Sequence, residues 1–379
     1  MMKIRSARLE REKPVRLSLG GEQQDALDAA VEWRSSWADG GKQEFVISGL
    51  AGTGKSTMIP SLVEAMPRPM VVCPTGKAAH VLRAKGVEAN TIHSKFYWPV
   101  RNRREGAKFR PKTYIDADTI IVDEASMVDS EMLQNMLRFG IPILFIGDPG
   151  QLGPVQQNPG LMDSPDFLLK QIHRQADGNP ILSLAYAFRE GREHMVRRAM
   201  ASGGIWRSPK GECIVATPRQ LEDYLHFGAQ VIVGFNRTRH ELNERIRSRR
   251  GIKGPPQVGE QIICLANNPW YGMFNGQQCT VIEVIGHNPR FIELCLRTDD
   301  GKIISAPCLL DQFGRDRIDS HRDNKVLQAD FGYALTAHKA QGCEFDSVVV
   351  LEEIYRSRDA SRWRYTAVTR AKKRLVYLW

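Results

Sequence analysis

Hydrophobic residues in the first 150 positions gather in short runs separated by longer polar stretches. The runs are bounded by Gly, Pro, Asp or Glu, and the stretches between them are long enough for helices. Strands of a parallel sheet look like this, because helices cover both faces of the sheet. We therefore expect an α/β domain with strands at EFVISG (44–49), PMVVCP (69–74), TIIVDE (119–124) and IPILFIGD (141–148).

A second set of apolar runs predicts a second sheet and comprises AQVIVGFN (229–236), DSVVVLEE (346–353) and RLVYLW (374–379). Between its members, residues 254–325 form β-rich runs separated by Gly, Asn, Asp and Pro turns, a pattern typical of a small barrel. The predicted fold class is α/β. Its first domain covers residues 1–155, its second covers 156–253 plus 326–379, and 254–325 is a β insertion in the second.

The segment GLAGTGKST (49–57) directly follows the first predicted strand and has the spacing G-x-x-x-x-G-K-[ST]. In that context backbone N–H groups at a helix start bind phosphate, so a chance glycine turn is the weaker alternative. Lys55 should reach the β- and γ-phosphates of ATP, and Ser56 should bind Mg²⁺. Pro60 should kink or shorten the following helix. The predicted nucleotide-binding residues here are Gly49, Ala51, Gly52, Thr53, Gly54, Lys55, Ser56 and Thr57.

Two adjacent carboxylates, Asp123 and Glu124, end the apolar run TIIVDE. Asp123 is placed to hold Mg²⁺ through water, and Glu124 to orient and deprotonate an attacking water. An isolated pair of this kind is more often solvated charge at a sheet edge. The phosphate-binding segment earlier in the chain favours the catalytic interpretation.

Lysine and arginine together number 53 against 43 acidic residues, giving a net charge of +10. This charge favours a polyanionic partner such as nucleic acid without establishing one. No apolar run approaches the roughly 18 residues of a membrane span, and the N-terminus lacks the apolar segment of a secretory signal. Seven scattered cysteines without a C-x-x-C pair predict free thiols in a reducing compartment, and neither zinc nor an iron–sulfur cluster.

The segment GDPGQLGPV (147–155) follows a predicted strand, so Asp148 and Gln151 lie at its carboxyl end beside the phosphate site. An amide there can bond both water and the γ-phosphate. Further motifs follow in order: CPTGKAAHVL (73–82), NTIHS (90–94), DEASMVDSEML (123–133), QIHRQ (171–175), VGFNRTRHELNERIR (233–247), YALTAHKAQGCEFDSVVV (333–350) and YTAVTRAKK (365–373). This ordered set resembles the superfamily 1 helicases, especially the RecD/Dda-like branch of DNA helicases, over nearly the whole chain.

The resemblance implies that ATP lies between two RecA-like domains. Arg174 and Arg370 match arginines that reach the γ-phosphate, where a guanidinium can contribute on the order of 10³ to 10⁵ in rate. The neighbouring Lys372, Lys373 and Arg374 are read as solvated or phosphate-facing charge. Three further matches to nucleotide-contacting positions are Gln23, Gly342 and Glu344, the last of which has a solvated surface charge as its alternative.

The resemblance also implies a path for single-stranded DNA. Hydroxyls, amides and single cations suit contacts to a phosphate backbone, because they position it without reading bases. The matching residues are Thr75, Lys77, Thr91, His93, Asn236, Arg239, Thr336, His338 and Lys339. For His93 the alternative is a packing role, and the basic residues after Arg239 are equally consistent with a solvated helix face.

Residues 95–116 interleave aromatic and basic side chains, where this branch carries a small pin that splits duplex. Phe96, Tyr97 and Trp98 are candidate wedge or stacking residues, since aromatic faces stack on bases. A hydrophobic anchor for a charged loop is the alternative. The insertion at 254–325 lies where relatives carry an SH3-like module.

The sequence thus predicts an ATP- and Mg²⁺-dependent DNA helicase that moves 5′ to 3′ on single-stranded DNA, the polarity coming from the resemblance alone. We expect a monomer that binds single strands and single-strand/duplex junctions, has possible replication or recombination partners, associates with no membrane, and works in the cytoplasm of a bacterial or phage-infected cell. Alternatives are a strand-stimulated translocase with little unwinding of its own, action on RNA, a P-loop kinase, and a nucleic-acid-binding protein with an inactive ATP site.

Overall fold

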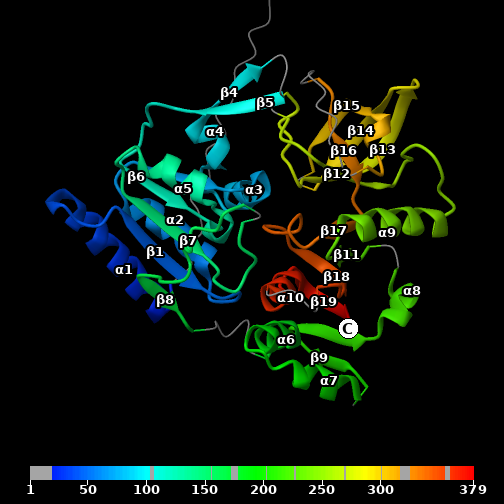
Figure 1. Cartoon of the computed structure of the whole chain (residues 1–379), viewed down its shortest axis with the longest axis horizontal. Coiled ribbons are helices and arrows are strands. Elements are labelled where there is room, and N and C mark those ends of the chain that lie inside the picture. The colour runs from blue at the N-terminus through cyan, green and yellow to red at the C-terminus, as the bar shows by residue number, and fades with distance from the viewer. Residues whose placement is uncertain are drawn as a thin grey trace, which may run out of the picture.

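The computed structural model describes residues 19–102, 106–154, 156–171, 178–201, 203–225, 228–268, 270–299, 301–315, 325–354 and 359–379. They form two six-stranded sheets, one five-stranded sheet and a two-stranded hairpin. In Figure 1 the first sheet lies on the left, the second at the lower centre and right, and the five-stranded sheet at the upper right.

The first sheet is parallel throughout, as the apolar runs predicted. Its strands in spatial order are β3 (Ala89–Thr91), β2 (Pro69–Cys73), β6 (Thr119–Val122), β7 (Ile143–Gly147), β1 (Glu44–Gly49) and β8 (Phe167–Leu169). Alternate strand residues pack on helices at opposite faces. One face carries α1 (Gly21–Ser36), α2 (Lys55–Ala65) and α3 (Gly76–Ala84); the other carries α4 (Ile92–Phe96) and α5 (Ser130–Leu137).

The second sheet is also parallel except at one edge, where β9 pairs antiparallel with β10. Its order is β17 (Ala334–Thr336), β11 (Gln230–Val233), β18 (Phe345–Leu351), β19 (Ala371–Leu378), β10 (Gly211–Ala216) and β9 (Ile205–Ser208). Its helices are α6 (Pro180–Arg189), α7 (Glu193–Ala201) and α10 (Ala360–Val368) on one face, and α8 (Leu221–Tyr224) and α9 (Asn236–Arg249) on the other.

The insertion forms an antiparallel sheet of five strands with its own apolar core. In order these are β15 (Ile303–Leu309), β14 (Phe291–Thr298), β13 (Gln278–His287), β12 (Gln261–Cys264) and β16 (Ala329–Phe331). The separate hairpin pairs β4 (Tyr97–Asn102) with β5 (Gly106–Pro111). In Figure 1 it reaches from the first sheet toward the insertion.

Two strands lie beyond the predicted domain limits. β8 follows residue 155 but pairs with β1 in the first sheet, and β16 follows residue 325 but pairs with β12 in the insertion. Both are three-residue strands, too short to be seen as apolar runs. The strand pairing therefore extends the first sheet to Leu169 and the insertion to Phe331.

The helix after the phosphate-binding segment continues past Pro60 and ends at Ala65, so the expectation that Pro60 shortens it is wrong. Among the described residues the longest helix, α1, has 16 residues, and no helix is both long and apolar enough to cross a bilayer.

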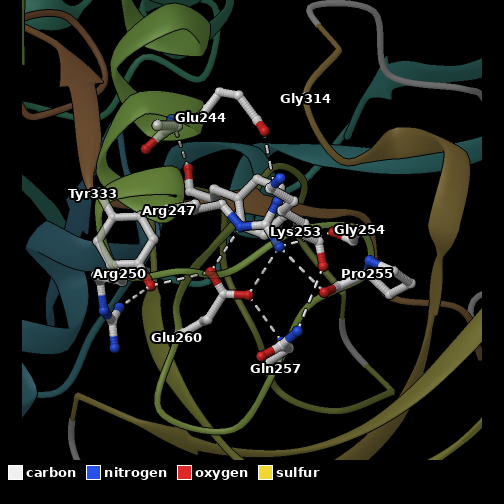
Figure 2. Close-up of polar contacts among 12 residues, drawn as sticks. Glu244, Arg247, Arg250, Lys253, Gly254, Pro255, Gln257, Glu260, Gly314 and Tyr333 are labelled. Atoms are coloured by element: carbon white, nitrogen blue, oxygen red, sulfur yellow. Dashed lines mark hydrogen bonds and ion pairs between the residues drawn. The ribbon is translucent and has the colours of Figure 1, made fainter.

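A buried ion pair joins the insertion to α9 (Figure 2). Arg247 donates from Nε to Glu260 Oε1 at 2.8 Å and from Nη2 to Glu260 Oε2 at 3.1 Å. The same guanidinium donates to the Gly254 carbonyl oxygen at 2.8 Å and lies 3.9 Å from the centre of the Phe331 ring. The Tyr333 hydroxyl adds a bond to Glu260 at 3.2 Å. The pair thus ties the helix to both ends of the inserted chain.

Candidate active site

The phosphate-binding loop between β1 and α2 depends on glycine at three positions. Gly52 and Gly54 have φ of +85° and +75°, a region that side chains other than glycine disfavour. A Cβ atom at Gly49 would lie 2.6 Å from Thr53 Oγ1, too close for any other residue. Because Gly54 is also the N-cap of α2, the loop delivers its N–H groups to a helix N-terminus, which favours anions.

Lys55, the first residue of α2, folds back over this loop. Its Nζ donates to the carbonyl oxygens of Gly49 at 2.6 Å and Leu50 at 2.9 Å. It also lies 3.7 Å from Oδ2 of Asp148, which is fully buried. The ammonium is therefore held where the P-loop meets the carboxyl end of β7.

The acidic pair follows β6 at the same edge of the sheet. Burial raises the pKa of Asp123 to about 7, helped by the neighbouring Glu124 carboxylate. Burial also raises the pKa of Glu124, opposed by the positive charges of Arg370 and Lys55. Glu124 has φ +55° and ψ +39°, a left-handed backbone that is unusual for glutamate. This backbone turns two successive carboxylates toward the site.

These groups line one cavity of about 1100 Å³ that draws residues from both large sheets. From the first sheet's side come Gln23, Ala51, Gly52, Gly54, Lys55, Ser56, Thr57, Lys77, Asp123, Glu124, Asp148 and Gln151. From the second come Asn179, Leu182, Gly342, Glu344, Thr369, Arg370 and Lys372. Most of the predicted nucleotide residues therefore meet around one space. Gly49 and Thr53 do not line it, and Thr53 Oγ1 instead donates to the Leu50 carbonyl oxygen within the loop at 2.8 Å.

Arg370 is fixed just before β19 and is 5% exposed. Its guanidinium donates to the carbonyl oxygens of Thr366 at 3.0 Å and Cys343 at 3.2 Å, and to Thr369 Oγ1 at 3.1 Å. Because these acceptors are neutral, the bonds fix the orientation of the guanidinium and leave its positive charge uncompensated. The arginine is therefore aimed from the second sheet into the cavity that holds the P-loop.

Two glutamines have different roles here. Gln23 Nε2 donates to the carbonyl oxygens of Thr53 at 3.3 Å and Gly54 at 3.1 Å, so it braces the P-loop. The Oε1 atom of Gln151 is buried and has no hydrogen-bond partner among the described residues. A buried unsatisfied acceptor calls for an explanation. Because Gln151 lines the cavity, a bound ligand or water is the partner that its position suits.

The candidate DNA contacts are more scattered. Thr75 and Thr91 cap α3 and α4, each accepting a bond at 3.2 Å from a backbone N–H. Lys77 forms an ion pair with Asp299 of the insertion. His93 stacks on Tyr97 at 5.3 Å, consistent with the packing alternative. Asn236 and His338 are exposed, Lys339 is half-buried, and Thr336 is 7% exposed.

Three predicted DNA contacts are wrong. Phe96 is fully buried in the first sheet's core, 5.6 Å from the Phe139 ring. Tyr97 is 7% exposed, and its hydroxyl accepts a bond from Asn135 at 3.0 Å. Arg239 is 1% exposed and pairs with Asp330 at 2.8 Å, so its charge is neutralised in the interior. The hydrophobic-anchor alternative therefore holds for Phe96 and Tyr97.

Trp98 differs from its two neighbours, because its side chain is 59% exposed. Lys112 Nζ lies 4.6 Å from the centre of its ring. Trp98 therefore keeps a face for stacking. The segment with Arg174 lies outside the described residues.

Sequence reasoning missed two contacts to the first sheet's nucleotide-side loops. Phe274 of the insertion packs against Gly76 at the start of α3, where an added Cβ would lie 2.1 Å from Phe274 Cβ. Tyr365 of α10 bonds both Ala51 and Asp148. The motif YTAVTRAKK contained this tyrosine, but its type alone gave no sign of its partners.

Comparison with known proteins gives two family matches. The model of an AAA domain matches residues 18–208, and that of a UvrD-like helicase C-terminal domain matches residues 331–378. The ATP-dependent RecD2 DNA helicase of Deinococcus radiodurans is 27% identical over 96% of this chain. The RecBCD enzyme subunit RecD of Mycolicibacterium smegmatis is 27% identical over 87% of this chain. The chain spans 49% and 67% of these two proteins.

A solved structure has a similar fold. The Pif1 helicase from Bacteroides, in complex with ADP-AlF3 and single-stranded DNA, superposes with a TM-score of 0.60 at 17% identity. The similarity covers 95% of this chain and 92% of that one.

Proposed function

Since the chain belongs to the AAA domain family, and within it to the RecD/Pif1-like helicases of superfamily 1B, we propose that it is an ATP-dependent DNA helicase. One observation carries the proposal. A single cavity collects a P-loop, an acidic pair and Arg370 from two sheets. A phosphate cradle on one side and a guanidinium on the other suit phosphoryl transfer driven by closure of two domains.

The proposed domains are RecA-like. The first comprises the first sheet, up to Leu169, and the second comprises the second sheet. The insertion would be the SH3-like module, and the β4–β5 hairpin the pin, with Trp98 as its stacking residue.

ATP and Mg²⁺ would bind in the cavity. The glycine-shaped loop offers N–H groups to phosphate, and the oxygens of Ser56 and Asp123 suit a hard cation. When bound, Mg²⁺ neutralises charge on the transferred phosphoryl group. Lys55 would bind the β- and γ-phosphates, Glu124 would orient and deprotonate the attacking water, and the free acceptor of Gln151 would hold that water.

Arg370, with Arg174, would stabilise charge that develops on the γ-phosphate oxygens. The backbone acceptors around Arg370 hold it without cancelling its charge. A guanidinium in this role contributes on the order of 10³ to 10⁵ in rate, equivalent to roughly 4 to 7 kcal/mol.

The DNA strand would contact members of the predicted set that are exposed or half-buried, on both sheets. Asn236, His338, Lys339 and the caps Thr75 and Thr91 remain in the proposal. Alternating grips on the strand would move the protein 5′ to 3′. Lys77 would contact phosphate after it leaves Asp299.

The decisive experiment measures ATP hydrolysis without nucleic acid, with single-stranded DNA and with RNA. Lys55→Ala should abolish turnover, and Arg370→Ala should lower it by at least about 10³-fold. Lys373→Ala is the matched control, because Lys373 is 73% exposed and pairs with Asp346 at the surface. Turnover of Arg370→Ala close to that of the unmodified chain would remove the arginine-finger assignment.

The same preparation tests polarity and the alternatives. Duplexes with either a 5′ or a 3′ single-stranded tail should show opening of the 5′-tailed substrate. Opening of only the 3′-tailed duplex would overturn the polarity. Strand-stimulated hydrolysis without separation would favour a translocase that needs a partner, and stimulation by RNA alone would replace DNA as the substrate.

A further inference from the structure

The peptide of Ala51 in the P-loop is held from both sides by helices of the second sheet. Its N–H donates to the Tyr365 hydroxyl of α10 at 2.7 Å. Its carbonyl oxygen accepts a bond from the Tyr186 hydroxyl of α6. The two helices are bonded to each other, since Ser361 Oγ donates to the Phe188 carbonyl oxygen at 2.7 Å. Any movement of this pair of helices therefore acts directly on the phosphate-binding loop.

The Tyr365 hydroxyl makes a second bond that Tyr186 does not make. It donates to Asp148 Oδ2 at 2.9 Å, the same oxygen that lies 3.7 Å from Lys55 Nζ. Tyr365 and Asp148 are both fully buried. Burial raises the pKa of Tyr365 well above its ordinary value, so its hydroxyl stays protonated and can keep donating. Lys55, Asp148 and Tyr365 thus form a continuous polar chain.

The next residue of α10 continues this chain to Arg370. Thr366 accepts the N–H of Leu152 on its hydroxyl at 2.8 Å, and its carbonyl oxygen accepts Arg370 Nε at 3.0 Å. Gln341 closes the other side of the Leu152 peptide by donating to its carbonyl oxygen at 2.8 Å. The loop that carries Asp148 and Gln151 is therefore fixed to the same helix that aims the guanidinium.

We propose that Tyr365 is a positioning residue that transmits occupancy of the γ-phosphate position from Lys55 and Asp148 to α10, and so to Arg370. The inference rests on the proposed function and deepens it. A phosphate in the P-loop draws the Lys55 ammonium away from Asp148. Without the Lys55 ammonium beside it, Asp148 Oδ2 accepts a stronger hydrogen bond from the Tyr365 hydroxyl, and that bond shortens. Because Tyr365 also holds Ala51, α10 and the P-loop approach each other, and Arg370 closes on the phosphate.

Tyr365→Phe, in the full chain, removes the hydroxyl and keeps the ring that packs on Gly150. Turnover of ATP with saturating single-stranded DNA should fall about 10- to 100-fold, as for loss of one hydrogen bond to a charged group, while KM changes less than about threefold. Tyr377→Phe is the matched control. It removes another buried hydroxyl, bonded to Glu352 inside the second domain, and should leave kcat and KM unchanged.

A second readout follows α10 directly. Binding of the ATP analogue AMP-PNP with Mg²⁺ should slow amide hydrogen exchange in residues 360–370 of the unmodified chain. In Tyr365→Phe the analogue should still bind, but this protection should be lost. Merely structural damage would instead speed exchange in these amides with and without the analogue.

Three results would overturn the relay: kcat of Tyr365→Phe within about twofold of the unmodified chain, intact protection of α10 by AMP-PNP, or an equal loss in Tyr186→Phe. An equal loss in Tyr186→Phe would assign the effect to the two tyrosine bonds that hold the Ala51 peptide, because Tyr186 does not bond Asp148. Failure of AMP-PNP to bind the unmodified chain would overturn the proposed function and the relay together. Binding without stimulation by DNA would overturn the DNA assignment alone, because the exchange readout needs no strand.

Discussion

The Arg247–Glu260 pair gives a sharp prediction about how the insertion is held. The two side chains are 2% and 0% exposed, and two short bonds join them. Removing one partner leaves the other charge buried and uncompensated, which destabilises proteins by about 3–5 kcal/mol. Arg247→Met and Glu260→Leu should each lower the local stability where α9 meets the insertion by this amount. The double variant should recover most of it, because an apolar pair of similar volume is often neutral.

Native-state hydrogen exchange measures this effect better than global unfolding, since a chain with several domains does not unfold in one step. The free energy of opening should fall for amides of α9 and β12 and stay constant for the first sheet. Arg237→Ala is the control on the same helix. Arg237 and its partner Glu241 are 89% and 60% exposed, so loss of this pair should lower the free energy of opening by less than about 0.5 kcal/mol.

Two outcomes would refute this reasoning. Single variants that each cost under about 1 kcal/mol would show that water or a shifted partner satisfies the remaining charge. A double variant that loses the sum of both singles would show that the two residues act independently.

Two further predictions concern the buried carboxyl group of Asp123 and the tight contact at Gly76. Burial raises the pKa of Asp123 from its ordinary 3.8 to about 7, so its stabilising contribution is full below about pH 4 and is lost as pH rises to about 7. In metal-free buffer, Asp123→Asn should therefore raise the free energy of opening of first-sheet amides above that of the unmodified chain, by an amount that grows from about pH 4 to about pH 7 and then stays constant. A gain independent of pH would contradict the raised pKa. Gly76→Ala should push Phe274 away and speed hydrogen exchange in residues 267–277. Gly286→Ala is the control, because it has open space around it and should leave this exchange unchanged. Equal exchange in both variants would refute the contact between Gly76 and Phe274.

The P-loop and its partners were predictable because their chemistry is local. A strand, a glycine spacing and a helix start determine where phosphate binds, and Asp123 and Gln151 each follow a strand that ends at the same edge. Parallel pairing then brings them together without further information. Arg370 differs, because it precedes the last strand of the other sheet, and only the resemblance to the helicases assigned it to the nucleotide.

The errors concern burial, which residue type does not determine. Phe96, Tyr97 and Trp98 are adjacent aromatics, yet the first two complete a core and only the third faces solvent. Arg239 sits in a basic stretch, but one partner, Asp330, lies 91 residues away in the chain and removes it from the surface. Contacts between distant segments decide such cases.

Tyr365 shows the complementary omission. Its partners Ala51 and Asp148 lie 314 and 217 residues away, so no spacing in the sequence connects them. A tyrosine within a helix is usually assigned to packing, and only the assembled interface gives its hydroxyl a role.

The left-handed backbone of Glu124 has a consequence for laboratory evolution. Such a conformation costs of order 1–3 kcal/mol for a residue other than glycine, and burial adds a penalty for the carboxylate. Glycine at this position would remove both penalties, which together exceed the roughly 0.4–1 kcal/mol that its greater freedom in the unfolded chain costs. A library screened for heat resistance alone should therefore enrich replacements of Glu124. The same library screened for ATP turnover should reject them, so the two screens would diverge at this single codon.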